Sequence, residues 1–412
     1  MTKQIFFLIS LFVVQFQQVI AQSNENKLEV VDSVFSNILN ESREFWVKLP
    51  ENYNPESDVK YPVIYLIDGF SLKNNLETVY NNYWGHYLPH MILVGISNSN
   101  NRTRDLTISQ VKTRRGGSVD TETGGADDFE EFLKKELIPF IDSKYPTTSY
   151  RTLIGHSYGG LFTINEFLKN NSVFKNYLAI DPSLEWDNQL IINQAKQKLK
   201  TEDFTGKSLF ISLAAEQLHM QDESITMDNI MNDTTEFSLF ARSIIEFSNL
   251  ASIQKQNGLK FAWKVYPEDL HGTVPLPAIR DGLIFLFDWY QFKSPQKYNN
   301  PETSVEELRE LLRNQEEIYT QNFGYETPPM IEELFNGYGY MNLQMEQSEK
   351  AKMFFEMAVK HYPNSASGYD GMVDYYMSVN DTSNAIIEAK KAFALDSSEY
   401  YSKRLKELKG KD

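Results

Sequence analysis

The pattern that most constrains the fold is an alternation of short apolar runs with longer segments of helical periodicity. Apolar runs predict strands over residues 28–38, 43–49, 62–67, 91–96, 152–154, 177–180, 208–213 and 261–266. Several of these runs are apolar without interruption, as buried parallel strands require, because both faces of such a strand are covered. The segments between them predict helices over 127–144, 159–170, 187–200, 236–256 and 278–292. Strands that alternate with helices predict an α/β fold with a doubly wound sheet.

Beyond a polar linker at 293–300 the pattern is entirely helical, and it repeats. Three pairs of small residues, each pair 34 residues apart, mark the repeat: Gly337 and Gly371, Ala351 and Ala385, and Ala358 and Ala392. A 34-residue period with small residues at helix crossings resembles a tetratricopeptide array. We therefore predict an α/β domain over 22–300 and an all-α helical-repeat domain over 301–412.

The first 21 residues have the pattern of a secretory signal peptide. Lys3 is followed by an uncharged apolar run from Ile5 to Val14, and Ala21 supplies a small residue for cleavage. The run is shorter than the ~20 residues that a membrane-spanning helix needs. The sequence therefore predicts export to the periplasm or the medium after cleavage near Ala21, with no membrane span.

Composition excludes several kinds of chemistry and partner. The chain has no cysteine, so it has no disulfide, no cysteine nucleophile and no cysteine-ligated zinc or iron–sulfur cluster. Lys and Arg total 40 against 56 Asp and Glu, which gives a formal charge of −16. A surface of this sign repels phosphate backbones, so nucleic acid is not an expected partner. The motifs described below require no cofactor and no metal.

One motif carries chemistry, Gly155-His156-Ser157-Tyr158-Gly159, which fits G-x-S-x-G. A strand-like run precedes it and a helix-like run follows, a context that predicts a nucleophile elbow with Ser157 Oγ at a helix N-terminus. Such a turn needs glycine at 155 and 159, because it leaves no room for Cβ atoms there. His156 is expected to point away from the nucleophile. The alternative is an ordinary strand–helix turn with an incidental serine.

A serine hydroxyl needs a base, and the base in turn needs a carboxylate. His271 follows the last predicted strand, where this order of elements delivers a base, and Gly272 lets its loop approach the nucleophile closely. Glu216 is the first carboxylate after the penultimate strand and is our predicted acid. Asp222, further along the same loop, and Asp181, at the end of the preceding strand, remain alternatives. A carboxylate in the position of Asp181 more often caps a turn.

Two backbone amides are predicted to bind the oxyanion that forms during ester cleavage. One is the amide of Tyr158, directly after the nucleophile. The other is the amide of Phe70, in the turn Asp68-Gly69-Phe70 that follows the strand 62–67.

Together these stretches resemble the putative-esterase family of α/β hydrolases, which includes esterase D-type enzymes, mycolyltransferases and enterobactin-type siderophore esterases. The resemblance covers about Val30 to Phe292. The segments 42–50 and 61–69 resemble the opening of the family as a whole. The segments 91–96, 102–105, 124–129, 155–162 and 179–188 are most similar to the siderophore-esterase branch. It implies the roles given above for Ser157, His271, Tyr158 and Phe70.

The chain departs from this family pattern at two positions. Glu185 stands where the family often has a tryptophan, and Asp181 stands where a serine is common. The first departure is expected to alter the wall against which substrate lies. The second adds a charge near the carboxyl edge of the sheet.

The expected substrate is a carboxylic ester, cleaved through an acyl-enzyme. Between Asn100 and Ser118 five basic residues face one acidic residue: Arg102, Arg104, Lys112, Arg114 and Arg115 against Asp105. A basic segment at the mouth of the site suits an anionic substrate such as a ferric catecholate lactone, with Arg102, Arg104 and Trp186 as candidate contacts. In the alternative interpretation these arginines pair with acidic neighbours in a solvated loop.

Three further functions stay open on the sequence alone. A carbohydrate-linked acetyl or feruloyl ester would use the same residues, as would acyl transfer to another acceptor. In a third interpretation the hydrolase domain is catalytically silent, and the chain binds a protein partner through its repeat domain.

Overall fold

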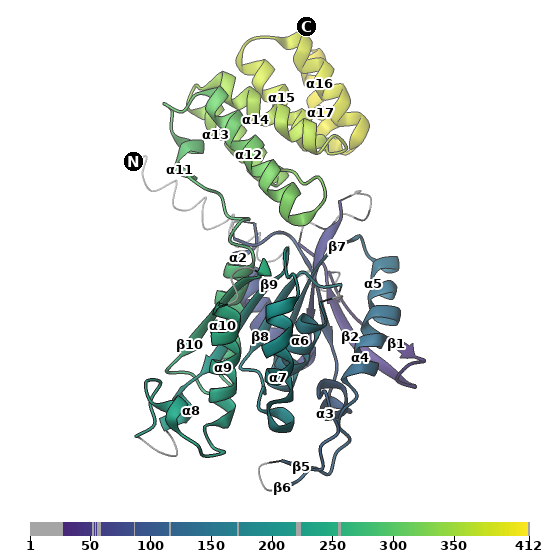
Figure 1. The fold of residues 1–412 in the computed structure, drawn as a ribbon. Helices are drawn as coiled ribbons and strands as arrows, with labels where there is room; N and C mark the ends of the chain where they lie inside the picture. The colour runs from purple at the N-terminus through teal and green to yellow at the C-terminus, as the bar shows by residue number, and fades with distance from the viewer. Residues whose placement is uncertain are drawn as a thin grey trace, which may run out of the picture. The chain divides into compact units, whose positions relative to one another are not determined.

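The computed structural model describes residues 28–410 apart from 52, 54, 56–58, 86, 115–116, 171–172, 220–223 and 254–256. The predicted signal peptide lies outside these residues, as do Asp222 and Arg115. The chain divides into two compact units, with the division after Asp288 (Figure 1).

Within its described residues the first unit contains a sheet of eight strands in the order β1-β2-β4-β3-β7-β8-β9-β10. The strands are β1 (Glu29–Ser36), β2 (Glu41–Lys48), β3 (Tyr61–Leu66), β4 (Ile92–Ile96), β7 (Thr147–His156), β8 (Asn176–Ile180), β9 (Ser208–Ala214) and β10 (Lys260–Tyr266). β2 pairs antiparallel with both β1 and β4, and the other neighbours are parallel. Every predicted strand is therefore present. The apolar run at 152–154 marks only part of β7, because its first residues are polar.

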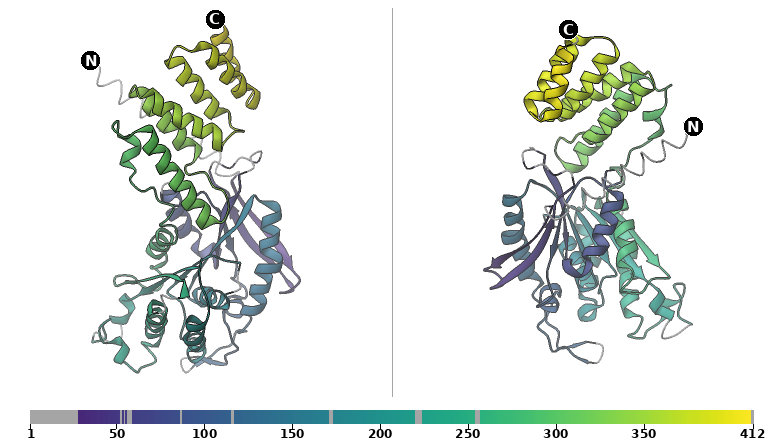
Figure 2. Two further views of the ribbon diagram at one scale, coloured as in Figure 1. Left: turned by 45° about the horizontal axis from the view of Figure 1, so that its top comes forward. Right: turned by 180° about the vertical axis from the view of Figure 1, so that it is seen from behind.

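Helices cover both faces of this sheet (Figures 1 and 2). They are α2 (Gly69–Tyr83), α3 (Arg102–Leu106), α4 (Ala126–Phe132), α5 (Ile138–Lys144), α6 (Tyr158–Lys169), α7 (Trp186–Thr201), α8 (Glu216–His219), α9 (Leu239–Ile253) and α10 (Pro275–Leu286). Adjacent residues of a strand point to opposite faces. In β8 the Tyr177 ring packs on Phe167 of α6, whereas Leu178 lies against Gly282 of α10. The doubly wound α/β prediction is therefore confirmed.

The sequence analysis missed several elements of this unit. α2 and α3 follow buried strands but are rich in polar residues, α8 has only four residues, and a short hairpin forms between β5 (Thr113–Arg114) and β6 (Gly117–Ser118). The helix predicted to reach 292 ends at Leu286. Trp289 and Tyr290 instead pack on Tyr319, with ring centroids 6.0 and 4.6 Å apart, so the second unit begins before the predicted linker.

The second unit is helical throughout its described residues. Its helices are α11 (Gln296–Asn299), α12 (Val305–Phe323), α13 (Glu332–Gln344), α14 (Ser348–His361), α15 (Ala366–Ser378), α16 (Thr382–Leu395) and α17 (Glu399–Lys409). α13 and α15 begin 34 residues apart, as do α14 and α16. The four alanines of the predicted repeat have no exposed surface. The assignment to tetratricopeptide repeats stays a prediction.

One of the predicted small-residue positions in this unit is wrong. A Cβ atom on Gly337 would have no heavy atom within 4 Å, so this glycine does not sit at a helix crossing. The close approaches occur at Gly339 and Gly371, where a Cβ would lie 2.4 and 2.2 Å from the ring of Phe355. The spacing pattern therefore picked the right helix but a residue on its wrong face.

The parallel strands place the candidate site residues at one edge of the sheet. α2 follows β3, the G-x-S-x-G motif follows β7, Asp181 follows β8 and His271 lies in the loop after β10. Because parallel strands end at the same edge, residues far apart in the sequence meet there. No helix among the described residues has the length and apolarity that crossing a membrane would take.

Candidate active site

Ser157 lies on the sharp turn between β7 and α6. Its φ of 59° and ψ of −116° are unusual for a residue with a side chain, a backbone conformation that costs ~1–3 kcal/mol and persists only where the surroundings fix it. The Ser157 amide donates to the carbonyl of Ile180 (3.0 Å), and the Ser183 amide donates to the carbonyl of Ser157 (3.1 Å). A Cβ on Gly155 would lie 2.1 Å from the carbonyl oxygen of Gly159, so glycine is required there.

His271 is held by a carboxylate, and that carboxylate is Asp181. His271 Nδ1 lies 2.6 Å from Asp181 Oδ2, and Asp181 Oδ1 accepts the amide of Ala214 at 2.9 Å. Asp181 has no exposed surface. Burial raises the pKa of its carboxyl group, and the hydrogen bond from His271 opposes that shift. A carboxylate only accepts hydrogen bonds, so His271 carries its proton on Nδ1 and leaves Nε2 free to accept one.

The prediction of Glu216 as the acid is wrong on this geometry. Glu216 begins α8, where its amide donates to the carbonyl of Asp269 (3.2 Å), and within the described residues its carboxylate makes no contact with His271. β8 lies directly beside the elbow strand β7, whereas β9 is one strand further away. A carboxylate at the end of β8 therefore starts closer to Ser157. The sequence signal was present in Asp181, directly after an apolar strand, but we interpreted it as a turn cap.

The two predicted oxyanion amides belong to the first turns of neighbouring helices. β3 and β7 are paired in parallel, so α2 with Phe70 and α6 with Tyr158 begin side by side. First-turn amides of a helix have no acceptor within it and can serve a ligand. A Cβ on Gly159 would lie 3.7 Å from Asp68 Oδ2, which shows that the two turns are in contact.

The predicted substrate contacts Arg102 and Arg104 are both engaged within the protein. Arg102 Nε donates to Asp68 Oδ2 (2.8 Å), and its guanidinium lies 5.3 Å from the centre of the Tyr158 ring. Arg104 pairs with Glu41 at 2.9 Å and with the fully buried Asp105 at 2.7 Å. Both arginines therefore pair with acidic neighbours, as our alternative interpretation expected. Arg104 forms two ion pairs, so its role is structural.

Arg114 of β5 is one of the five basic residues of the segment 100–118, and it was not among our candidate substrate contacts. Its guanidinium pairs with Glu185, donates to the hydroxyl of Tyr158, and lies 5.1 and 5.5 Å from the ring centres of Tyr158 and Trp186. Trp186 is only 1% exposed, and its indole N–H donates to Ser109 Oγ (3.1 Å). Trp186 therefore supports Tyr158 and Arg114 from inside, which differs from the direct substrate contact that we predicted.

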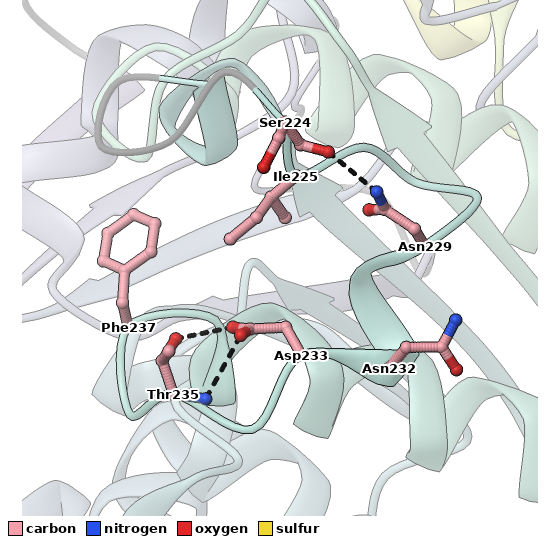
Figure 3. A pocket seen from close by; sticks show the side chains of 7 residues that line it. All are labelled: Ser224, Ile225, Asn229, Asn232, Asp233, Thr235 and Phe237. Carbon is pink, nitrogen blue, oxygen red and sulfur yellow. Dashed lines mark hydrogen bonds between the residues drawn. The ribbon is translucent and has the colours of Figure 1, made fainter.

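A separate cavity of about 430 Å³ lies in the segment that precedes α9 (Figure 3). It is lined by Ser224, Ile225, Asn229, Asn232, Asp233, Thr235 and Phe237, and none of the predicted site residues lines it. The same segment leads to Phe240, whose ring lies edge-on to His271 at 5.5 Å. Among the described residues no group of three or more His, Asp or Glu side chains is arranged to hold a metal ion.

Comparison with known proteins identifies the family of this chain. The family model described as "Putative esterase" matches residues 36–265. Ferri-bacillibactin esterase BesA of Bacillus subtilis is 29% identical over 46% of this chain and 71% of its own length. The siderophore enterobactin esterase of Emericella nidulans is 30% identical over 40% of this chain, a match that spans 56% of that relative's own length.

Solved structures share the fold. A crystal structure of an IroE-like serine hydrolase from Shewanella oneidensis superposes with a TM-score of 0.65 and 25% identity, covering 80% of this chain and 98% of that one. An uncharacterised protein from Capnocytophaga ochracea has a TM-score of 0.56 at 16% identity and covers 93% of this chain and 99% of its own. The family model matches more than half of the residues, within a unit that has the expected sheet and elbow. The chain therefore belongs to the putative esterase family, and it is a serine esterase with an α/β-hydrolase unit followed by an all-α unit.

Proposed function

We propose that this esterase hydrolyses a siderophore ester with Ser157 as nucleophile, His271 as base and Asp181 as the carboxylate that supports the base. The observation that carries the proposal is the 2.6 Å contact between His271 Nδ1 and Asp181 Oδ2, at the edge of the sheet where the strained elbow of Ser157 also lies. The substrate class follows from the relatives, two of which are named as esterases of ferri-bacillibactin and of enterobactin.

The reaction begins at the serine hydroxyl. Ser157 Oγ attacks the ester carbonyl while His271 Nε2 takes the hydroxyl proton, and Asp181 stabilises the imidazolium that results. The negative charge moves onto the former carbonyl oxygen, where the amides of Tyr158 and Phe70 donate to it. His271 then gives its proton to the departing alcohol as the ester C–O bond breaks, which leaves an acyl group on Ser157.

Water completes the cycle by the same steps. His271 Nε2 takes a proton from water, the hydroxide oxygen bonds to the acyl carbon, and the bond to Ser157 Oγ breaks as that oxygen regains the proton. The products are a carboxylic acid and the free enzyme. Asp181 stays ionised throughout, since its part is to fix the tautomer and to balance the imidazolium charge.

Replacing the nucleophile tests the proposal, and a neighbouring hydroxyl supplies the control. Ser157→Ala should lower kcat on p-nitrophenyl esters by ~10⁴-fold or more and abolish labelling by a fluorophosphonate. Ser183→Ala removes a hydroxyl only 3.4 Å from Ser157 Oγ and should stay labelled, with kcat within about tenfold of wild type. A Ser157→Ala enzyme that kept more than about a tenth of wild-type activity would contradict the assignment.

A second comparison tests the substrate class. Ferric and iron-free catecholate trilactones should be cleaved with a higher kcat/KM than any simple p-nitrophenyl ester. If the enzyme cleaved the simple esters but neither trilactone, the proposed triad would stand and the siderophore assignment would be wrong. Export after Ala21, and a protein partner on the helical unit, stay predictions of the sequence.

A further inference from the structure

His156, inside the elbow motif, has an imidazole that the reaction above does not use. Its Nε2 lies 2.8 Å from the main-chain carbonyl oxygen of His271, 115 residues further along the chain. The two imidazole rings are 4.4 Å apart with 37° between their planes. The sequence analysis expected His156 to point away from the nucleophile, and it reaches the loop that carries the base.

The contact fixes the protonation of His156. A carbonyl oxygen only accepts, so Nε2 of His156 carries a proton and donates it. Burial, together with the neighbouring His271, lowers the pKa of His156 to about 3. His156 is therefore uncharged at neutral pH, and it adds no positive charge beside the imidazolium that His271 forms during the reaction.

The loop that carries His271 has few other ties to the sheet. Residues 269–274 bond mostly among themselves: Leu270 and Thr273 exchange hydrogen bonds, and the Thr273 hydroxyl donates to Asp269. At His271 itself, two contacts reach the carboxyl edge of the sheet. Asp181 at the end of β8 holds the ring, and His156 at the end of β7 holds the main chain.

Among the described residues, the other groups that face the two imidazole rings are a phenyl ring and a guanidinium group whose charge is paired. Phe240 of α9 is uncharged and lies edge-on to His271. Arg102 of α3 donates to the main-chain carbonyl of His156 at 3.3 Å, and its charge is paired with Asp68. The one ionised partner of the His271 ring is thus Asp181.

We propose that His156 is a positioning residue for catalysis, because its Nε2–H holds the main chain of His271 so that the ring keeps its contact with Asp181 and its other nitrogen can serve Ser157. This inference rests on the proposed function of His271 as base. The expected consequence of losing the contact is a displaced base, and a displacement of ~1 Å in a catalytic group can cost ~10²-fold in rate.

Two variants separate positioning from packing. His156→Met removes the donor but keeps a side chain of similar length, and should lower kcat by about 10- to 100-fold with KM for a p-nitrophenyl ester changed less than about threefold. His156→Gln can place an amide N–H near the position of Nε2 and should return kcat to within about threefold of wild type. Fluorophosphonate labelling rates should follow kcat, because labelling needs the same base. Thermal melting of both variants reports any loss of folding.

Each outcome of these measurements supports or overturns the inference. It is supported if kcat is near the wild-type value in His156→Gln but low in His156→Met, with equal Tm values for the two variants. A Met variant with more than a third of wild-type kcat overturns it, as does a Gln variant no better than Met. If Ser157→Ala is inactive while His156→Met is unaffected, only the role of His156 falls. If Ser157→Ala is active, the proposed function falls instead.

Discussion

Two carboxyl groups of the hydrolase unit, Asp181 and Glu166, lie in regions that solvent does not reach, and they differ in what faces them. Both have no exposed surface, and burial raises the pKa of both. Asp181, at the carboxyl edge of the sheet, meets an imidazole at 2.6 Å and a backbone amide at 2.9 Å. Glu166, on the side of α6 that faces α4, has no hydrogen-bond partner for either carboxylate oxygen among the described residues.

The cations near Glu166 are turned toward other carboxylates. Lys134 and Lys169 lie 3.9 and 3.7 Å from it, beyond hydrogen-bonding distance, and both pair more closely with Glu130. Attraction at this range offsets only part of the cost of burying a charge, so the pKa of Glu166 rises to about 7. Burial and a raised pKa therefore do not by themselves identify a catalytic carboxylate. The partner distinguishes the two: Asp181 faces His271, the base of the proposed triad.

A third carboxylate, Glu185, represents an intermediate case. Its side chain is 3% exposed and pairs with Arg114, whose guanidinium also donates to Tyr158, the residue after the nucleophile. Glu185 therefore affects the charge beside Tyr158, which directly follows Ser157. Removing the charge of each of these three carboxylates should therefore change a different property of the protein: the rate, the stability or the substrate preference.

The largest effect is expected at Asp181. Asp181→Asn should lower kcat by about 10²- to 10⁴-fold, because an amide supports neither the required tautomer of His271 nor its positive charge. Glu216→Gln, the acid we predicted from sequence, is the matched control and should cost less than about tenfold. Steady-state kinetics of both on one p-nitrophenyl ester at one pH decide between them. A crippled Glu216→Gln beside an active Asp181→Asn would reverse our assignment.

An intermediate effect, on stability and not on kcat, is expected at Glu166. Its folded pKa of about 7 exceeds the ordinary carboxyl value of 4.5, so the folded state binds this proton more tightly than the unfolded state does. The resulting stabilisation is complete below about pH 4 and is lost as the pH rises through about 7. Glu166→Gln should therefore stabilise the protein by about 1–3 kcal/mol at about pH 8, and by little at about pH 5.

Thermal melting at the two pH values measures this effect. Glu131→Gln, at an exposed ion pair with Lys135 on the same stretch, is the control and should leave Tm nearly unchanged at both. If Glu166→Gln lowered kcat more than about tenfold while the fold stayed intact, Glu166 would belong with Asp181 and the contrast between the two regions would fail.

The smallest effect is expected at Glu185, on substrate preference. Glu185→Gln leaves the positive charge of Arg114 unbalanced, which should favour an anionic acyl group by about 1 kcal/mol at this partly exposed site. The ratio of kcat/KM for the p-nitrophenyl monoester of adipic acid to that for p-nitrophenyl hexanoate should rise about three- to tenfold. Glu131→Gln removes the same charge elsewhere and should not change the ratio. An unchanged ratio in Glu185→Gln would show that the acyl group does not sense Arg114.

Most of the fold could be predicted from sequence because its signals are local. A continuous apolar run is long enough to specify a buried strand, and all the predicted strands of the sheet are present. α2 and α3 were missed because their polar residues outweigh a narrow apolar face. The elbow was found because Gly155 is required by a contact only four residues away: a Cβ on Gly155 would lie 2.1 Å from the carbonyl oxygen of Gly159.

By itself the sequence determined the order of strands and helices and the elbow at Ser157, and it predicted His271 as the base, since each depends on neighbours along the chain. The partners of these residues were decided only by the tertiary structure. Asp181 reaches His271, and His156 reaches the His271 carbonyl, because β7, β8 and the loop after β10 end at one edge of the sheet. The charges of Arg102 and Arg114 are balanced for the same reason. Arg102 pairs with Asp68 and Arg114 pairs with Glu185, and both carboxylates lie in other loops at that edge. The separation of two residues along the chain does not predict such contacts, because the order in which strands pair differs from their order in the sequence.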